Sequence, residues 1–234
     1  MKLFRSIRQN LIKEGKLKRY LLYAIGEILL VMIGISLAFQ VNNWNDNLIK
    51  RNAEIRFYQN IKEQITDDKE LIEGQMNYNN HYMLQFNYAN EIIEANDRSK
   101  IDTLGLIVRN LTNYSDFDKQ GNIYETMVNS GEIKLLHNHN IVNGIRELEE
   151  IYNYVNRMEN IHYDAMMTII IDAVFPVLNY TTGEIKKSDN VFNYEFQNLL
   201  AMLLQIMEEK DSTYNKAIDE IERVTKLIDA ELKD

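Results

Sequence analysis

Residues 20–44, YLLYAIGEILLVMIGISLAFQVNNW, decide how this chain is organised. The 21 residues from Leu21 to Val41 include a single charged side chain, that of Glu27. Because a helix rises about 1.5 Å per residue, a run of this length covers the roughly 30 Å hydrocarbon core of a bilayer. The stretch therefore predicts one transmembrane helix over residues 20–44.

The charges on either side of this stretch are strongly asymmetric. Residues 1–19 hold seven basic side chains and one acid, whereas the whole chain has a formal charge of −9. Basic side chains next to a span resist translocation. We therefore predict a cytoplasmic tail over residues 1–19 and a periplasmic domain over residues 45–234, in a bacterial inner membrane. The basic side chains expected at the membrane surface are Lys2, Arg5, Arg8, Lys13, Lys16, Lys18 and Arg19.

The composition excludes several classes of protein. The chain has no cysteine, which rules out disulfides and cysteine-ligated metal centres and suits an oxidising compartment. An acidic domain outside the cytoplasm is a poor candidate for binding nucleic acid. The lipid bilayer is the first partner that the sequence predicts.

A basic tail followed by an apolar run is also the pattern of a cleaved signal peptide. Ser36-Leu37-Ala38 resembles the small-x-small cleavage site of such peptides. However, the run is longer than the usual ~7–15 apolar residues, and Glu27 interrupts it. We therefore favour an uncleaved anchor.

The predicted span carries aromatic, small and acidic residues at distinct places. Aromatic side chains, which favour the two membrane interfaces, stand near its ends as Tyr20, Tyr23 and Trp44. Small or polar residues that would let a second helix approach are Gly26, Glu27, Gly34, Ser36 and Ala38. We favour Glu27 as a polar contact between copies or with a partner helix, over proton transfer in an ion-coupled complex.

Residues 45–234 predict an all-α domain, an antiparallel bundle of four principal helices. Apolar residues recur at steps of three, four or seven from Phe57 to Ile93 and from Ile141 to Ile169. Residues 192–207 and a terminal segment up to residue 234 are expected as two further helices. Turns are expected at Gly131 and Gly183.

The sequence offers few candidates for chemistry. Glu159-x-x-His162 matches one half of a di-iron element, but no second copy exists, so we interpret His162 as a half-buried packing residue. His137-Asn138-His139 is interpreted as a polar turn. Asp67-Asp68 and Glu149-Glu150 are interpreted as solvated charges rather than calcium ligands. No nucleophile, phosphate-binding or dinucleotide motif is present, and we predict no enzyme activity, cofactor or metal site.

Three stretches carry a resemblance to a known family. They are FRSIRQNL at residues 4–11, YAIGEILLVMIGI at 23–35 with QVNNWN at 40–45, and YETMVNSGEIKLL at 124–136. The chain resembles a family of uncharacterised single-span proteins common in Bacteroidota. The resemblance implies an inner-membrane protein with a helical periplasmic domain, and it implies no activity.

These observations lead to one preferred function and two alternatives. We predict a single-pass inner-membrane protein that scaffolds or regulates a membrane assembly, through self-association or a membrane-protein partner. The first alternative is a ligand-sensing periplasmic bundle, which an apolar pocket between helices would favour. The second is an accessory of an ion-coupled motor or transporter that uses Glu27.

Overall fold

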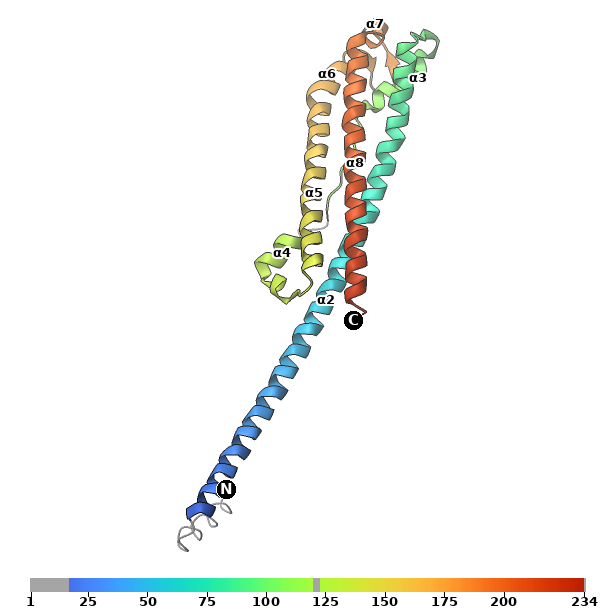
Figure 1. The fold of residues 1–234 in the computed structure, drawn as a ribbon. Helices are drawn as coiled ribbons and strands as arrows, with labels where there is room; N and C mark the ends of the chain where they lie inside the picture. The colour runs from blue at the N-terminus through green and yellow to red at the C-terminus, as the bar shows by residue number, and fades with distance from the viewer. Residues whose placement is uncertain (1–16, 120–122, 234) are drawn as a thin grey trace. The chain divides into compact units, whose positions relative to one another are not determined.

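The computed structural model describes residues 17–119 and 123–233, and it is almost entirely helical (Figure 1). The α-helices are α2 (Leu17–Glu94), α3 (Ile101–Arg109), α4 (Ile123–Ser130), α5 (His139–Ala165), α6 (Ile171–Val174), α7 (Ser188–Val191) and α8 (Tyr194–Glu231). Short 3₁₀ segments are η1 (Arg98–Lys100), η2 (Asn110–Thr112) and η3 (Glu132–Leu135), and η4 (Met166–Ile170) is a π-helix. The prediction of an all-α chain, with a long apolar N-terminal helix followed by a helical bundle, is confirmed.

By its internal contacts the chain divides into two units, one ending at Glu54 and one beginning at Ile55. The described part of the first unit is the N-terminal portion of α2, which contains the apolar run. The second unit contains the remainder of α2 and every later element.

Three long helices form the second unit: α5, α8 and the part of α2 from Ile55 onwards. Helices α5 and α8 run side by side in opposite directions (Figure 1). Ion pairs join α2 to α8, with Lys62 Nζ 2.5 Å from Asp229 Oδ1 and Lys69 Nζ 2.7 Å from Glu222 Oε1. The prediction of four principal helices is wrong in one respect, because the two expected C-terminal helices are the single helix α8.

The core of this unit consists of two separate groups of buried apolar side chains. The first, which we name the Phe86 cluster, includes Phe86, Leu104, Val108, Ile170, Leu200, Leu203 and Met207. The second, the Ile145 cluster, includes Ile65, Ile72, Ile145, Leu148, Tyr152, Val155, Tyr214 and Ile221. Helices α2 and α8 contribute side chains to both clusters, whereas α5 contributes only to the Ile145 cluster. The residues of α8 between the two clusters include the buried polar side chains of Lys210 and Thr213.

The connection between α6 and α7 holds a small hairpin of β1 (Leu178–Asn179) and β2 (Glu184–Ile185). Gly183 lies in its turn with φ of 76°, as the sequence predicts, and Gly131 has the same φ after α4. The hairpin packs closely on α3, because a Cβ added to Gly105 would lie 2.0 Å from the carbonyl oxygen of Gly183. This contact requires glycine at position 105.

Candidate functional site

The apolar run of α2 exposes large side chains along its length. Leu22, Leu30 and Ile35 are 68%, 63% and 65% exposed, and none of the most apolar window is buried. Among the described residues, this is one helix long and apolar enough to cross a membrane. Tyr23 and Trp44 are exposed near its two ends. The predicted surface residues Lys2, Arg5, Arg8, Lys13 and Lys16 lie outside the described residues, as do the side chains of Arg19 and Tyr20.

The geometry of the helix shows that the five residues predicted at the helix interface do not all lie on one face. Each residue of an α-helix turns the chain by about 100°, so steps of seven and four keep Glu27, Gly34 and Ala38 on one face. Gly26 is turned by about 100° from Glu27, so it lies to the side of that face. Ser36 points to the opposite side of the helix, so the interface prediction depends on the other residues.

The second candidate is a buried polar layer between the two apolar clusters, formed by Ser115, Glu159, His162, Lys210 and Tyr214. Helix α5 supplies Glu159 and His162, α8 supplies Lys210 and Tyr214, and the segment after η2 supplies Ser115. All five side chains are buried, and Lys210 is only 1% exposed. Helix α2 adds Asn79, which donates to the Met207 carbonyl oxygen at 3.0 Å, next to the layer.

Hydrogen bonds connect the layer across three elements. The Lys210 ammonium donates to the Ser115 carbonyl oxygen at 2.7 Å and lies 3.2 Å from His162 Nδ1. Glu159 Oε1 accepts from the Phe117 backbone N–H at 2.8 Å and from the Tyr214 hydroxyl. Within the described part of the chain, Glu159 Oε2 and His162 Nε2 have no hydrogen-bond partner.

Burial shifts the protonation equilibria of this layer. Burial raises the pKa of Glu159, although bonds from Tyr214 and Phe117 oppose the shift. Burial, followed by the nearby Lys210 charge, lowers the pKa of His162 to about 3. Burial also lowers the pKa of Lys210, against the attraction of Glu159, Asp116 and Asp211. His162 is therefore neutral, and it is fully buried rather than half-buried as the sequence indicated.

The other polar candidates take structural positions. Asn138 of the His137-Asn138-His139 turn caps α5 by accepting from the backbone N–H groups of Asn140 and Ile141, so the interpretation as a polar turn is confirmed. Asp68 is 1% exposed and accepts from the Tyr152 hydroxyl at 3.1 Å. Its interpretation as a solvated charge was wrong. No group of three or more His, Asp or Glu residues suited to a metal occurs in residues 17–119 and 123–233.

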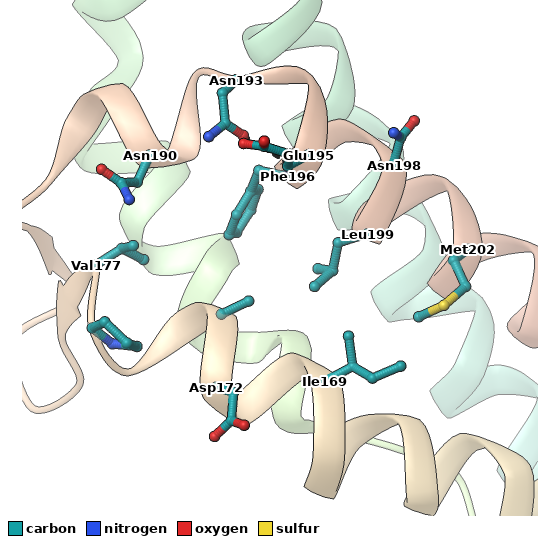
Figure 2. Close-up of a pocket in the computed structure, with 12 residues that line it drawn as sticks. Ile169, Asp172, Val177, Asn190, Asn193, Glu195, Phe196, Asn198, Leu199 and Met202 are labelled. Carbon is teal, nitrogen blue, oxygen red and sulfur yellow. Dashed lines mark hydrogen bonds between the residues drawn. The ribbon is translucent and has the colours of Figure 1, made fainter.

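A pocket of about 540 Å³ lies between α6 and the beginning of α8 (Figure 2). Its apolar floor includes Phe196 and Leu199, which face Ile169 across the pocket, while Asn190, Asn193 and Glu195 gather at one rim. The preceding π-helix η4 distorts the helical path at this point, and such distortions are frequent at functional sites. No sequence pattern predicted this pocket, because it forms between residues far from any recognisable motif.

The sequence did contain one sign of the polar layer. Lys210 stands three residues after Met207 and four before Tyr214, so it occupies a position on the apolar stripe of α8. A lysine on a buried stripe requires polar partners. Its partner Ser115 lies in an irregular segment, whose position relative to α8 no periodicity predicts.

Comparison with known proteins identifies the family of the chain. Neither a curated protein nor a solved structure matches it. The family profile of DUF6090 matches residues 27–220, which begin inside the apolar run and extend well into α8. The chain therefore belongs to DUF6090, a family of unknown function.

Proposed function

We propose that this protein is a non-enzymatic, single-pass inner-membrane protein whose helical domain scaffolds or regulates a membrane assembly. In this proposal residues 1–19 are cytoplasmic and the domain that follows the span is periplasmic. Copies associate through the face of α2 that carries Glu27, Gly34 and Ala38.

One observation carries the proposal: the exposure of the apolar side chains between Leu21 and Val41. Each large apolar side chain left in water forgoes about 1.5–3 kcal/mol of burial free energy. An exposed run of this length is therefore stable only where something apolar covers it, and its length suits a bilayer. The basic tail supports the orientation through the positive-inside rule.

Single-cysteine labelling tests the orientation, because the natural chain has no cysteine and needs no background removed. Lys216 is exposed on α8 and serves as the labelling position. We expect Lys216→Cys to react with a membrane-impermeant maleimide in cells whose outer membrane alone is permeabilised. A Cys variant that reacts only after the inner membrane is disrupted would contradict a periplasmic domain.

Cysteine crosslinking tests the self-association. Ala38→Cys lies on the proposed contact face, and Ser36→Cys is a matched control on the opposite face of the same turn. We expect oxidation in native membranes to give disulfide-linked dimers for Ala38→Cys and far fewer for Ser36→Cys. Equal crosslinking of both variants, or of neither, would refute this contact face.

Substitutions of Glu27 distinguish a role in assembly from a role in ion coupling. A carboxyl group within a bilayer costs several kcal/mol unless it is protonated or hydrogen-bonded, and contact between copies supplies a partner. Glutamine retains hydrogen bonding but cannot take up or release a proton, so we expect Glu27→Gln to keep the dimer and Glu27→Leu to weaken it. Loss of function in Glu27→Gln with an intact dimer would favour the ion-coupled alternative.

The pocket of Figure 2 favours a second candidate, ligand sensing by the bundle. Its volume of about 540 Å³ falls within the usual range of about 300–1,000 Å³ for small-molecule sites. Its apolar floor and a rim that carries both amide and carboxylate groups suit an amphipathic molecule.

A blocking substitution tests this candidate. Ala173 lines the pocket, so Ala173→Trp fills it, whereas Ala201→Trp adds the same ring at an exposed position of α8 that does not line it. We expect compounds that raise the melting temperature of the natural protein to keep their effect in Ala201→Trp and lose it in Ala173→Trp. Equal effects in both variants would exclude the pocket as the binding site.

A further inference from the structure

The polar layer contains a histidine and a carboxyl group whose protonation has opposite effects on its stability. His162 is fully buried, and the Lys210 ammonium lies 3.2 Å from its Nδ1. An ammonium group can only donate, so Nδ1 must accept and the ring hydrogen stands on Nε2. If the His162 ring were a charged imidazolium, its Nδ1–H would point at the Lys210 ammonium, so two donors would face each other with no acceptor between them. The closed layer therefore excludes the charged form of His162.

Glu159 behaves in the reverse way in the same layer. The Glu159 residue is 4% exposed, and its buried Oε2 has no hydrogen-bond partner among the described residues. Leaving a carboxylate oxygen without a donor in a buried site favours the protonated carboxyl. The closed layer therefore retains a proton on Glu159 at a higher pH than an open, hydrated layer does.

The groups around Glu159 and His162 come from every element packed against them. Helix α8 contributes Lys210, Asp211 and Tyr214, and the segment after η2 contributes Tyr114 and Asp116. At this level α2 contributes the uncharged amide of Asn79, which donates to Asp211 Oδ1 at 2.9 Å. No second basic group among the described residues acts on Glu159 besides Lys210.

We propose that the polar layer is a pH-responsive joint between the Phe86 and Ile145 clusters, in which His162 favours opening in acid and Glu159 opposes it. Opening admits water to the layer, so His162 takes up a proton and Glu159 gives one up. In the natural protein the effects of His162 and Glu159 on opening therefore largely cancel as the pH falls. The Glu159 side chain thus sets how strongly opening depends on pH. This inference holds on either side of the membrane and is independent of the proposed function.

The direction of each contribution follows from proton linkage. The lowered pKa of His162 means that the open state binds more protons below the ordinary histidine value of 6.5, so acid favours opening. The raised pKa of Glu159 means that the closed state binds more protons above the ordinary value of 4.5, so acid favours closing. Between pH 4.5 and pH 6.5 both effects act, and they oppose each other.

Hydrogen exchange in the full-length protein in lipid nanodiscs, at pH 7.5 and 5.5, tests the joint. The readout is the protection of backbone amides in residues 155–166 and 203–214, corrected for intrinsic exchange. With Glu159→Gln we expect the equilibrium constant for opening to be about ten-fold larger at pH 5.5 than at pH 7.5. This is the factor for a histidine that stays neutral in the closed state and has its ordinary pKa in the open state. The natural protein should show a smaller change.

Three further variants complete the design. His162→Gln should reverse the response, so that protection in these segments is higher at pH 5.5 than at pH 7.5. Glu159→Gln with His162→Gln should show only the smaller acid response that the lowered pKa of Lys210 produces. Glu208→Gln, at an exposed position of α8, is the matched control and should behave as the natural protein does. An acid response in Glu159→Gln no larger than in the natural protein would overturn the proposal.

A spectroscopic measurement keeps the test independent of how well the variants fold. The chain has four histidines, and the ring signal that is missing from the spectrum of His162→Gln identifies the signal of His162. We expect the ¹³C resonances of the His162 ring in the natural protein to report a neutral imidazole at pH 5.5. A charged His162 ring at that pH, with the domain still folded, would also overturn the proposal.

Discussion

Two tyrosines of α5 make hydrogen bonds of equal length in different surroundings. The hydroxyl of Tyr152 donates to buried Asp68 at 3.1 Å, and that of Tyr154 donates to Glu209 at 3.1 Å on the surface. Burial raises the pKa of Tyr152 far above its ordinary value, so its hydroxyl keeps the hydrogen that it donates. Removing a donor from a buried carboxylate costs about 1–3 kcal/mol, whereas water replaces an exposed donor.

We therefore expect Tyr152→Phe to lower the free energy of unfolding by about 1–3 kcal/mol. Tyr154→Phe, which removes the same atom from the same helix, should change it by less than about 0.5 kcal/mol. Denaturant unfolding of the full-length chain in detergent micelles, followed by circular dichroism, measures both. Equal losses in the two variants would mean that burial does not govern the strength of these bonds.

The glycines of the chain differ in what a methyl group would contact. At Gly105 a Cβ would lie 2.0 Å from the carbonyl oxygen of Gly183, so Gly105→Ala must displace the hairpin. We expect a cost of about 1–3 kcal/mol, as for other overpacked sites. At Gly74, within α2, a Cβ meets nothing within 4 Å, so Gly74→Ala should stabilise the helix by about 0.5–1 kcal/mol. Thermal melting distinguishes the two signs.

At the scale of the element, the beginning of α8 depends on a side-chain cap. Asn193 Oδ1 accepts from the Phe196 backbone N–H at 2.8 Å, which satisfies one of the free donors of the first turn. We expect Asn193→Ala to cost about 1 kcal/mol, or roughly 2–4 °C in the melting temperature of a domain of this size. Gln205→Ala, at an exposed interior position of α8, is the control and should cost nothing, because alanine favours a helix.

Periodicity predicted some elements well and failed at identifiable residues. The stripes of α2 and α5 were predicted because their apolar positions are nearly unbroken, and the structure buries Ile65, Ile72, Ile145 and Leu148. In α8 the polar run from Glu208 to Thr213 separates two apolar segments, so the sequence indicated two helices. That run is nevertheless helical, and Lys210 and Thr213 are buried within it, with the Thr213 hydroxyl donating to the Glu209 carbonyl oxygen at 2.8 Å.

The candidate sites show the same limit. Glu159 and His162 could be selected from the sequence because they stand three residues apart on one helix. Their partners, Lys210 and Ser115, are 48 and 47 residues away from His162 in opposite directions along the chain, and only the fold brings them together. The pocket between α6 and α8 arises in the same way, from residues whose types are ordinary for a helical domain.

At the scale of the whole molecule, one substitution placed at two exposed positions of α2 tests what surrounds each part of the chain. Leu30 is 63% exposed in the apolar run, and Leu84 is 74% exposed in the second unit. If lipid surrounds Leu30 and water surrounds Leu84, a charge is costly only at the first position. An arginine near the centre of a span costs at least about 2.5–3.5 kcal/mol of insertion free energy.

We therefore expect Leu30→Arg to move a measurable share of the chain out of the membrane fraction that resists alkaline extraction, because the added cost lowers the insertion equilibrium by at least about 60–300-fold. Leu84→Arg should remain wholly in that fraction, since its charge stays hydrated. Circular dichroism of both variants in detergent separates failed insertion from failed folding. Identical extraction of the two variants would mean that the apolar run is covered by protein rather than by lipid, which would remove the basis for a single-pass anchor.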